Sequence, residues 1–341
     1  MRAFLSCILP LCLVAVFGAP GTSAAEQARP WLGVHVLMTS ADKTAQLAEV
    51  VGQLAQLGIN TIVAEINYGY EYQSHPELRA ANPSSKEQIR NLVAECRKCH
   101  VRLIPQFQCL GHQSWSRHTF PLLVKYPEFD ETPGQYANNQ GIYCRSWCPL
   151  HPEVNRVVFS LMDELIDAFE ADALHVGMDE VFLIADDACP RCKGKDKAEL
   201  FAKAVNDYHK YLVDKKKLDM LMWGDRLINA DKIHYGKWEA SANGTAAAID
   251  RIGKAIVVCD WHYERRDTYE SIPMFLEKGF RVWPASWRKL EATKALVGYS
   301  RTMNNTRMLG HLNTTWGAVP IKKLPAFEPI LHATSCFAQS E

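Results

Sequence analysis

The chain has 341 residues, of which 48% are hydrophobic, and it carries 38 basic and 38 acidic side chains. This length and composition suffice for one large hydrophobic core. The balanced charge argues against a nucleic-acid partner and against attraction to an anionic membrane, so a neutral partner is expected.

The first predicted element is a signal peptide. Arg2 precedes an apolar run over residues 3–17, and the small residues 22–25, Thr-Ser-Ala-Ala, follow it. This order is typical of a secretory signal, with cleavage near Ala25. The run is shorter than the roughly 20 residues that span a bilayer. We therefore expect a secreted or periplasmic protein without a stable membrane anchor, with residues 1–25 as the signal and residues 26–341 as one domain.

Short apolar or β-branched runs then alternate with longer helical patterns. Strands are expected at 31–38, 61–65, 102–108, 173–176, 220–223, 256–260, 281–284 and 308–314. Helices are expected at 42–57, 85–99, 153–170, 195–216, 271–278 and 290–304. This alternation predicts a single-domain α/β protein with the (β/α)8 TIM barrel fold. A doubly wound open sheet is the alternative, but no Gly-rich phosphate loop follows an early strand.

The ends of the predicted strands carry a distinct set of side chains. In a barrel these C-terminal ends meet at one mouth, and the long loop over residues 109–151 lies on the same face. The residues at the strand ends are Glu65, Asn67, Gln108, His112, His175, Asp179, Glu180, Trp223, Asp225, Asp260, Trp261, Tyr263, Trp287, Asn313 and Trp316. Carboxylates transfer protons, polar groups bind hydroxyls and flat rings cover the apolar face of a sugar. The set therefore predicts a carbohydrate site.

The motif at residues 175–180, His-Val-Gly-Met-Asp-Glu, presents two consecutive acids after an apolar strand. Strict alternation along a strand would direct Asp179 and Glu180 to opposite faces. Both reach the mouth only if the chain leaves β geometry there, and Gly177 makes such a turn plausible. The alternative is a surface loop with two solvated acids.

This motif resembles His-x-Gly-Gly-Asp-Glu of glycoside hydrolase family 20, the β-N-acetylhexosaminidases, with Met178 in place of the second Gly. Residues 104–112, which end in Leu-Gly-His, resemble the third strand of that family. Residues 222–225, Met-Trp-Gly-Asp, and 315–317, Thr-Trp-Gly, resemble its fifth and eighth strand ends. The resemblance covers the whole barrel, and the Asp-Glu pair is its most specific part.

The resemblance implies retaining, substrate-assisted hydrolysis of terminal β-linked N-acetylhexosamine residues, either GlcNAc or GalNAc. Glu180 is the implied general acid and base, and Asp179 is implied to orient the 2-acetamido group, which attacks the anomeric carbon. The implied substrate-binding residues are Glu65, Asn67, His112, Trp223, Asp225, Trp261, Tyr263 and Trp316. The expected partner is an amino-sugar oligosaccharide or glycoconjugate, and no catalytic cofactor is expected.

Two positions depart from the family pattern. The first predicted strand lacks the Arg that holds O3 and O4 of the sugar, and Ala318 replaces the acid that follows the last Trp-Gly. These departures leave the identity of the sugar open. They also leave two alternatives, a glycosidase whose nucleophile is Asp225 or Asp260, and a sugar-binding barrel without catalysis.

Nine of the 11 cysteines remain when Cys7 and Cys12 of the signal are set aside. Two pairs lie in loops on the same face of the predicted barrel, namely Cys144 with Cys148 and Cys189 with Cys192. We expect these four cysteines to clamp the two loops together, either as a structural zinc site or through disulfides.

Overall fold

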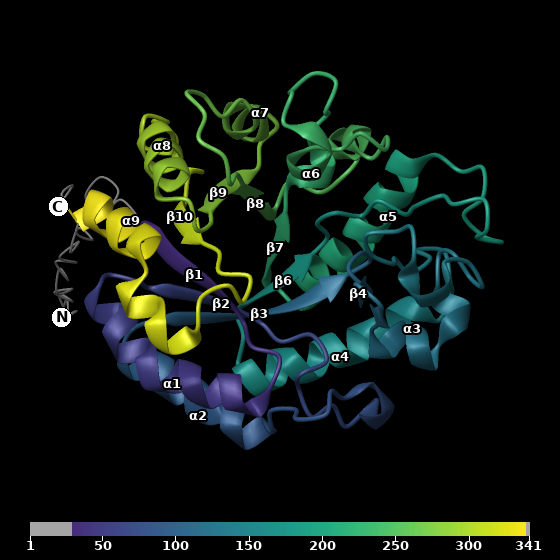
Figure 1. Ribbon diagram of the computed structural model, residues 1–341, viewed down its shortest axis with the longest axis horizontal. Helices are drawn as coiled ribbons and strands as arrows, with labels where there is room; N and C mark the ends of the chain where they lie inside the picture. Colours follow the sequence, from purple (N-terminus) through teal and green to yellow (C-terminus); the bar gives the residue numbers. More distant parts are fainter. Residues whose placement is uncertain (1–28, 339–341) are drawn as a thin grey trace, which may run out of the picture.

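The computed structural model describes residues 29–338, so the predicted signal peptide lies outside the described residues (Figure 1). Eight parallel strands close into a barrel in the order β1-β10-β9-β8-β7-β6-β3-β2. They are β1 (Trp31–Leu37), β2 (Thr61–Glu65), β3 (Arg102–Cys109), β6 (Ala173–Gly177), β7 (Asp219–Trp223), β8 (Ile256–Trp261), β9 (Arg281–Ser286) and β10 (Gly310–Asn313). The predicted (β/α)8 barrel is confirmed, and the predicted strand ends differ from these by two residues at most.

Helices surround the barrel on its outer side (Figure 1). The six predicted ones are α1 (Ala41–Gln56), α2 (Lys86–Lys98), α4 (Val154–Phe169), α5 (Lys197–His209), α7 (Ser271–Glu277) and α8 (Leu290–Arg301). The end of the predicted stretch 195–216 is a π-helical segment, Lys210–Lys215. Helices α1 and α2 begin after Ser40 and Ser85, whose hydroxyls accept the backbone N–H three residues ahead.

Several elements were not predicted. The turn Ile321–Ala326 packs against α1, and the final helix α9 (Glu328–Ala338) packs against α8 and β1 (Figure 1). The long loop after β3 contains the hairpin β4 (Ser114–Trp115) and β5 (His118–Thr119) and the short helix α3 (Pro121–Lys125), and α6 (Gly236–Glu239) follows β7. None of the helices in the described part of the chain has the length and apolar character needed to cross a membrane.

The barrel interior follows the alternation of the strands. Every second side chain points inward, and the others pack beneath the helices. The inner apolar cluster consists of Val63, Ile104, Ala173, Leu221, Trp223, Val257, Cys259, Trp261, Trp283, Ala285 and Leu312. Toward the C-terminal ends the inward positions become polar, with buried Glu65, Gln106 and His175. The strand ends therefore deliver polar groups to the mouth while the layers below stay apolar.

Trp283 on β9 fills the interior next to β1. Its side chain is fully buried, and its Nε1 donates to the carbonyl of Trp31 at 3.0 Å. A Cβ atom added at Gly33 would lie 2.3 Å from Cζ2 of this indole. Gly33 is therefore required by close packing in the barrel.

We expect Gly33→Ala to lower the free energy of unfolding by about 1–3 kcal/mol, because overpacking forces the buried indole or the strand to move. Urea unfolding followed by circular dichroism measures this change. The matched control is Gly298→Ala in α8, where no atom lies within 4 Å of the added Cβ. The control should be neutral or slightly stabilising. Equal stability of Gly33→Ala and wild type would contradict this packing.

Candidate active site

A strained turn after β6 carries the two acids. Gly177, Met178 and Glu180 have φ angles of 68°, 77° and 48°. This left-handed region costs a non-glycine residue about 1–2 kcal/mol. A Cβ atom at Gly177 would lie 2.1 Å from Oε1 of Gln108, so glycine is required there for space as well as for conformation. The turn takes the chain out of β geometry, as the paired acids require.

Asp179 is buried between a donor amide and a histidine. Nε2 of Gln108 donates to Oδ1 of Asp179 at 2.5 Å. Nε2 of His112 lies 3.3 Å from Oδ2 of Asp179 and 3.1 Å from Oε2 of Glu180. Burial acts to raise the pKa of Asp179, but His112 and Gln108 outweigh it and hold this pKa below its usual value. Burial acts to lower the pKa of His112, but the two acids raise it well above the usual value. At neutral pH the pair is therefore an aspartate and an imidazolium.

Tyr143, from the long loop, is a second partner of Glu180. Burial raises the pKa of Tyr143 far above its usual value, and the charge and hydrogen bond of Glu180 raise it further. The phenol therefore stays protonated and donates to the Glu180 carboxylate. The neighbouring thiol of Cys144 donates to the backbone carbonyl of Glu180 at 3.6 Å. Side chains of the long loop thus contact both the carboxylate and the backbone of Glu180.

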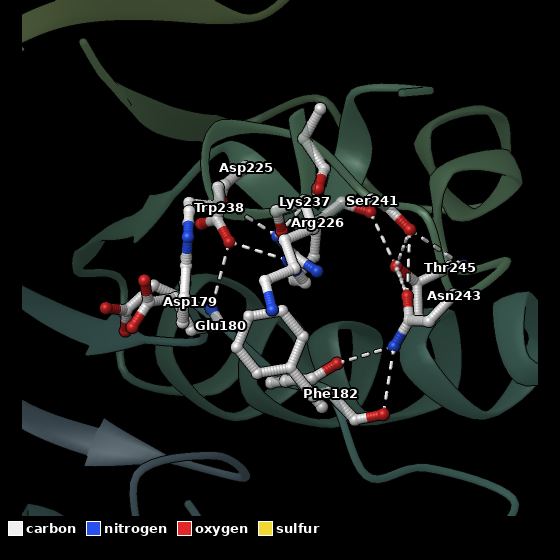
Figure 2. Close-up of polar contacts among 12 residues, drawn as sticks. Asp179, Glu180, Phe182, Asp225, Arg226, Lys237, Trp238, Ser241, Asn243 and Thr245 are labelled. Atoms are coloured by element: carbon white, nitrogen blue, oxygen red, sulfur yellow. Dashed lines mark hydrogen bonds and ion pairs between the residues drawn. The ribbon is translucent and has the colours of Figure 1, made fainter. Parts of the chain in front are cut away.

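Asp225, at the end of β7, anchors the turn from the other side (Figure 2). Its Oδ2 accepts from the backbone N–H of Glu180 at 2.9 Å and from Nε of Arg226 at 2.6 Å, and its Oδ1 accepts from Nε1 of Trp261 at 3.2 Å. Burial raises the pKa of Asp225 to about 6; Arg226 acts against this rise and the negative Asp179 adds to it. The Asp225 carboxyl group thus binds three donors, one of which is the backbone N–H of Glu180.

Arg226 lies beneath the site and fixes the loop that follows β7. Its fully buried side chain donates through Nη2 to the carbonyls of Lys237, Trp238 and Ala240, each at 2.8 Å. Its guanidinium carbon also lies 4.8 Å from the ring centre of Phe182 (Figure 2). One cation thereby holds the indole of Trp238 close to the acid pair.

The aromatic residues predicted as substrate-binding lie together, but not all of them are accessible. Nε1 of Trp316 donates to the hydroxyl of Tyr263 at 2.6 Å, and the ring of Tyr263 lies 4.8 Å from that of Trp261. Trp223 is fully buried beneath Trp316, at 5.5 Å between ring centres. Its side chain lies in the inner apolar cluster of the barrel, and its predicted contact with a sugar stays a prediction. Trp223 forms the floor under the other rings.

Glu65 and Asn67 form a buried network that supports Gln108. Glu65 accepts from Nε2 of Gln106 at 2.9 Å and from Nδ2 of Asn67 at 2.8 Å, and it pairs with Nε2 of His35 at 2.9 Å. Oδ1 of Asn67 accepts from the backbone N–H of Gln108 at 2.8 Å. Gln108 in turn donates to Asp179, so Glu65 and Asn67 help to position the acid pair through Gln108. Their predicted contact with a substrate stays a prediction.

His35 stands on β1, the strand that lacks the expected Arg, and it is fully buried against the rings of Trp223 and Trp316. It therefore offers no substitute for that Arg at the surface of the site. Ala318, in place of the second expected polar group, is exposed. His175, the first residue of the motif, is buried with a pKa far below its usual value because of burial, and its Nδ1 accepts from the N–H of Gly177 at 3.0 Å.

A group of aromatic residues at the mouth was missed by the sequence reasoning. Trp115 is 54% exposed and Trp238 is 40% exposed. The ring of Tyr143 lies 5.5 Å from Trp115, 4.8 Å from Trp238 and 5.7 Å from Phe182. We call these four residues the aromatic platform. They come from three loops, those after β3, β6 and β7, so no regular spacing along the chain predicts them.

Asp260 lies in a separate buried network. Its Oδ2 accepts from the hydroxyl of Ser271 at 2.6 Å, and Oδ1 lies 3.2 Å from Nε2 of His262. Burial acts to lower the pKa of His262, but Asp260 and Glu239 outweigh it and raise this pKa to about 9. The carboxylate is thus buried and paired with the charge of His262.

Two groups of side chains have the arrangement of metal ligands in the described residues. One is His112 with Asp179 and Glu180, and the other is Glu131 with Cys148, Cys189 and Cys192. The predicted cluster of four cysteines is therefore wrong in one member. Cys144 lies at the backbone of Glu180 instead, and Glu131 occupies the fourth place.

A closed β/α barrel whose mouth holds paired carboxylates, an imidazolium and exposed indoles has the construction of a carbohydrate-active barrel protein. Residues 48–319 match the model of glycosyl hydrolase family 20, catalytic domain, and the chain belongs to this family. The match begins within α1, so β1, where the expected Arg is absent, lies outside it.

Relatives with this domain differ greatly in sequence. A β-hexosaminidase of Akkermansia muciniphila is 28% identical over 109 residues, which are 32% of this chain and 22% of that protein. A β-hexosaminidase of Porphyromonas gingivalis is 24% identical over 173 residues, 48% of this chain and 22% of that protein. The chain thus matches about a fifth of the length of these relatives. The structure of a Flavobacterium johnsoniae chitobiase superposes with a TM-score of 0.65 at 17% identity, over 89% of this chain and 48% of that one.

We expect His112→Asn to reduce stability most at low pH. Because the pKa of His112 is raised in the folded state, its stabilising contribution is fully present below about pH 6.5 and is lost as the pH rises through the folded value. Urea unfolding from about pH 6 to about pH 9 measures the difference between variant and wild type. The difference should shrink toward high pH. His234→Asn, at an exposed residue, is the control, and a constant difference for His112→Asn would contradict the ion pair.

Proposed function

We propose that this protein is a retaining β-N-acetylhexosaminidase that releases terminal β-linked GlcNAc or GalNAc from glycans by substrate-assisted catalysis. The observation that carries the proposal is the arrangement of Asp179 and Glu180 around one imidazolium, at 3.3 Å and 3.1 Å from Nε2 of His112. Membership of the family supports the same assignment. Export through the predicted signal over residues 1–25 would place the enzyme with extracellular or periplasmic glycans.

Glu180 is the proposed general acid. It gives its proton to the glycosidic oxygen as the bond from this oxygen to the anomeric carbon breaks. The 2-acetamido oxygen of the substrate attacks the anomeric carbon from the opposite face and forms an oxazolinium ring. Glu180 then removes a proton from water, which attacks the same carbon and opens the ring. Two inversions give net retention.

Asp179 is proposed to accept a hydrogen bond from the acetamide N–H and to stabilise the positive charge of the oxazolinium ring. An ionised carboxylate accepts about four hydrogen bonds, so the contacts with Gln108 and His112 leave room for this one. The lowered pKa of Asp179 keeps its carboxylate ionised at neutral pH. Its charge is therefore present before the positive charge develops on the substrate.

The alternative of a protein nucleophile is disfavoured by the neighbouring carboxylates. Asp225 is engaged by three donors, and Asp260 is bound to Ser271 and His262. Asp179 lies on the same side as Glu180, whereas a retaining pair of carboxylates flanks the bond that is cleaved. The nucleophile that remains is the acetamido group of the substrate.

We expect Glu180→Gln to lower kcat/KM about 10²–10⁴-fold for a disaccharide substrate, because proton transfer to the leaving sugar is lost. The loss should be smaller for the 4-nitrophenyl glycoside, whose leaving group needs little protonation. Asp179→Asn should lower kcat/KM about 10²–10³-fold for both substrates, because the acetamide is no longer oriented. Release of 4-nitrophenol and of free sugar measures these rates.

The plain β-glucoside is the matched control substrate, since it has a hydroxyl in place of the acetamido group. Equal turnover of the glucoside would refute substrate assistance and favour a protein nucleophile. A thiazoline analogue of the bicyclic intermediate should inhibit the wild type. Tight binding of chitobiose without turnover would favour the non-catalytic sugar-binding barrel.

The aromatic platform lies beside Glu180, so we propose that it binds the leaving-group sugar by stacking. Trp238→Ala should raise KM for a disaccharide about 3–10-fold, the value of one stacked ring, and leave kcat and the KM of a methyl glycoside unchanged. The backbone carbonyl that binds Arg226 is retained in this variant. The exposed apolar residue Leu331 on α9 supplies the control Leu331→Ala. An equal rise in KM for both substrates would contradict this role.

A further inference from the structure

A second polar cluster lies apart from the acid pair. Glu131 and Cys148 come from the long loop after β3, and Cys189 and Cys192 come from the segment after β6. All four side chains are buried, and one ligand atom of each lies within 4.8 Å of the other three. Three thiols and one carboxylate thus converge from two loops that are far apart in sequence.

The carboxylate of Glu131 lacks a cationic partner in the part of the chain that the structure describes. Its Oε1 accepts the backbone N–H of Asp186 at 3.1 Å, and apart from the thiols of Cys192 and Cys189, which belong to the same cluster, no donor in the described residues reaches its Oε2. A buried carboxylate without a counter-charge is costly. The unpartnered oxygen in a pocket of thiols is the independent sign that a cation belongs there.

The sulfur positions fit a metal better than a disulfide. Sγ of Cys148 lies 3.2 Å from Sγ of Cys192. A tetrahedral zinc with Zn–S distances of about 2.3 Å separates two sulfurs by about 3.8 Å, whereas a disulfide requires about 2.04 Å. The backbone N–H of Cys192 also points to Sγ of Cys189 at 3.4 Å, which stabilises a thiolate. Three thiols cannot all pair among themselves, but all three can bind one ion.

We propose that Cys148, Cys189, Cys192 and Glu131 form a structural Zn²⁺ site. Thiolates with one carboxylate suit zinc among the common divalent ions, and four protein ligands leave no open position for catalysis. Binding releases the three thiol protons to solvent and forms three Zn–S bonds and one Zn–O bond. Arg191, between two of the ligands in the sequence, interacts with Cys148 electrostatically and offsets part of the remaining negative charge.

This site would join the two loops that surround Glu180. The backbone N–H of Cys148 donates to the carbonyl of Phe129 at 2.7 Å, and the N–H of Glu131 donates to the carbonyl of Ser146 at 3.0 Å. The two ligands from the long loop therefore lie on segments that are hydrogen-bonded to each other. Tyr143, which contacts Glu180, lies on the same loop. Zinc therefore sets the position of Tyr143 through the fold, and the proposal stands independently of the reaction that the protein catalyses.

The test is metal analysis of the full-length protein purified under reducing conditions without chelator. We expect about one zinc per chain in the wild type. Cobalt exchanged into the protein should show the intense visible bands of a tetrahedral ion and thiolate-to-cobalt charge transfer. Cys189→Ser and Cys192→Ser should lose the metal and unfold at a lower temperature. Cys99→Ser and Cys336→Ser, at partly buried cysteines outside the cluster, should keep the metal.

The wild-type stoichiometry and the cobalt spectrum decide the proposal even if a cysteine variant fails to fold. Metal-free wild type would overturn it, and a Cys148–Cys192 cross-link found by mass mapping without reduction would replace it with a disulfide. Zinc that is retained in the cysteine variants but lost in His112→Asn would place the ion at the acid pair and would also overturn it. Because zinc content is measured without a glycoside, failure here is separable from failure of the proposed hydrolysis.

Discussion

Two adjacent carboxylates can share one barrel mouth only if the backbone between them leaves the strand conformation. Left-handed backbone at Gly177, Met178 and Glu180 achieves this after β6. Such a turn is unfavourable by itself, so its surroundings must hold it. Asp225 binds the N–H of Glu180, and Gln108 binds Asp179, which fixes the turn from two neighbouring strands. The remaining features of the site depend on this constraint.

Two buried arginines organise the loops around that turn. Arg226 donates to three carbonyls of the loop after β7, and Arg145 donates to the carbonyls of residues 135 and 136 and to Asp130 in the long loop. A guanidinium suits this task because its donors are fixed in one plane. The result is that Tyr143 and Trp238, from different loops, lie 4.8 Å apart beside Glu180. The hydrogen bonds of the two arginines thereby fix the backbone of the loops that carry these aromatic residues.

The electrostatics of the mouth separate the roles of similar groups. Asp179 is kept ionised by the imidazolium of His112, whereas Asp225 has a pKa raised to about 6 by burial and is engaged by donors. Asp260 is neutralised against His262. Three carboxylates at neighbouring strand ends therefore have three different environments. Only the Asp179–Glu180 pair retains the combination of charge and access that proton transfer on a sugar needs, which is why the proposed mechanism relies on the substrate for its nucleophile.

Local pattern was a good guide where one segment decides the outcome. The run of Thr61–Glu65 is β-branched and apolar, so it predicted its own strand, and the Asp-Glu pair after β6 is recognisable without its neighbours. The interpretation was wrong where distant segments compete for a position. Cys144 and Cys148 are close in sequence, yet one meets the backbone of Glu180 and the other meets Cys192. Nothing local distinguishes two cysteines whose partners lie 36 and 44 residues away.

By itself the sequence determined the barrel and the acid pair, because alternation of strands and helices and the Gly that permits the turn are properties of short segments. Tertiary structure alone decided which polar residues face the mouth. Trp223 and Glu65 end their strands as Trp261 does, but Trp223 lies under other rings and Glu65 is enclosed by His35, Gln106 and Asn67. It also brought Glu131 to three thiols and Tyr143 to Trp238. Such contacts arise from the closure of the barrel, which brings together loops whose separation in the sequence carries no signal.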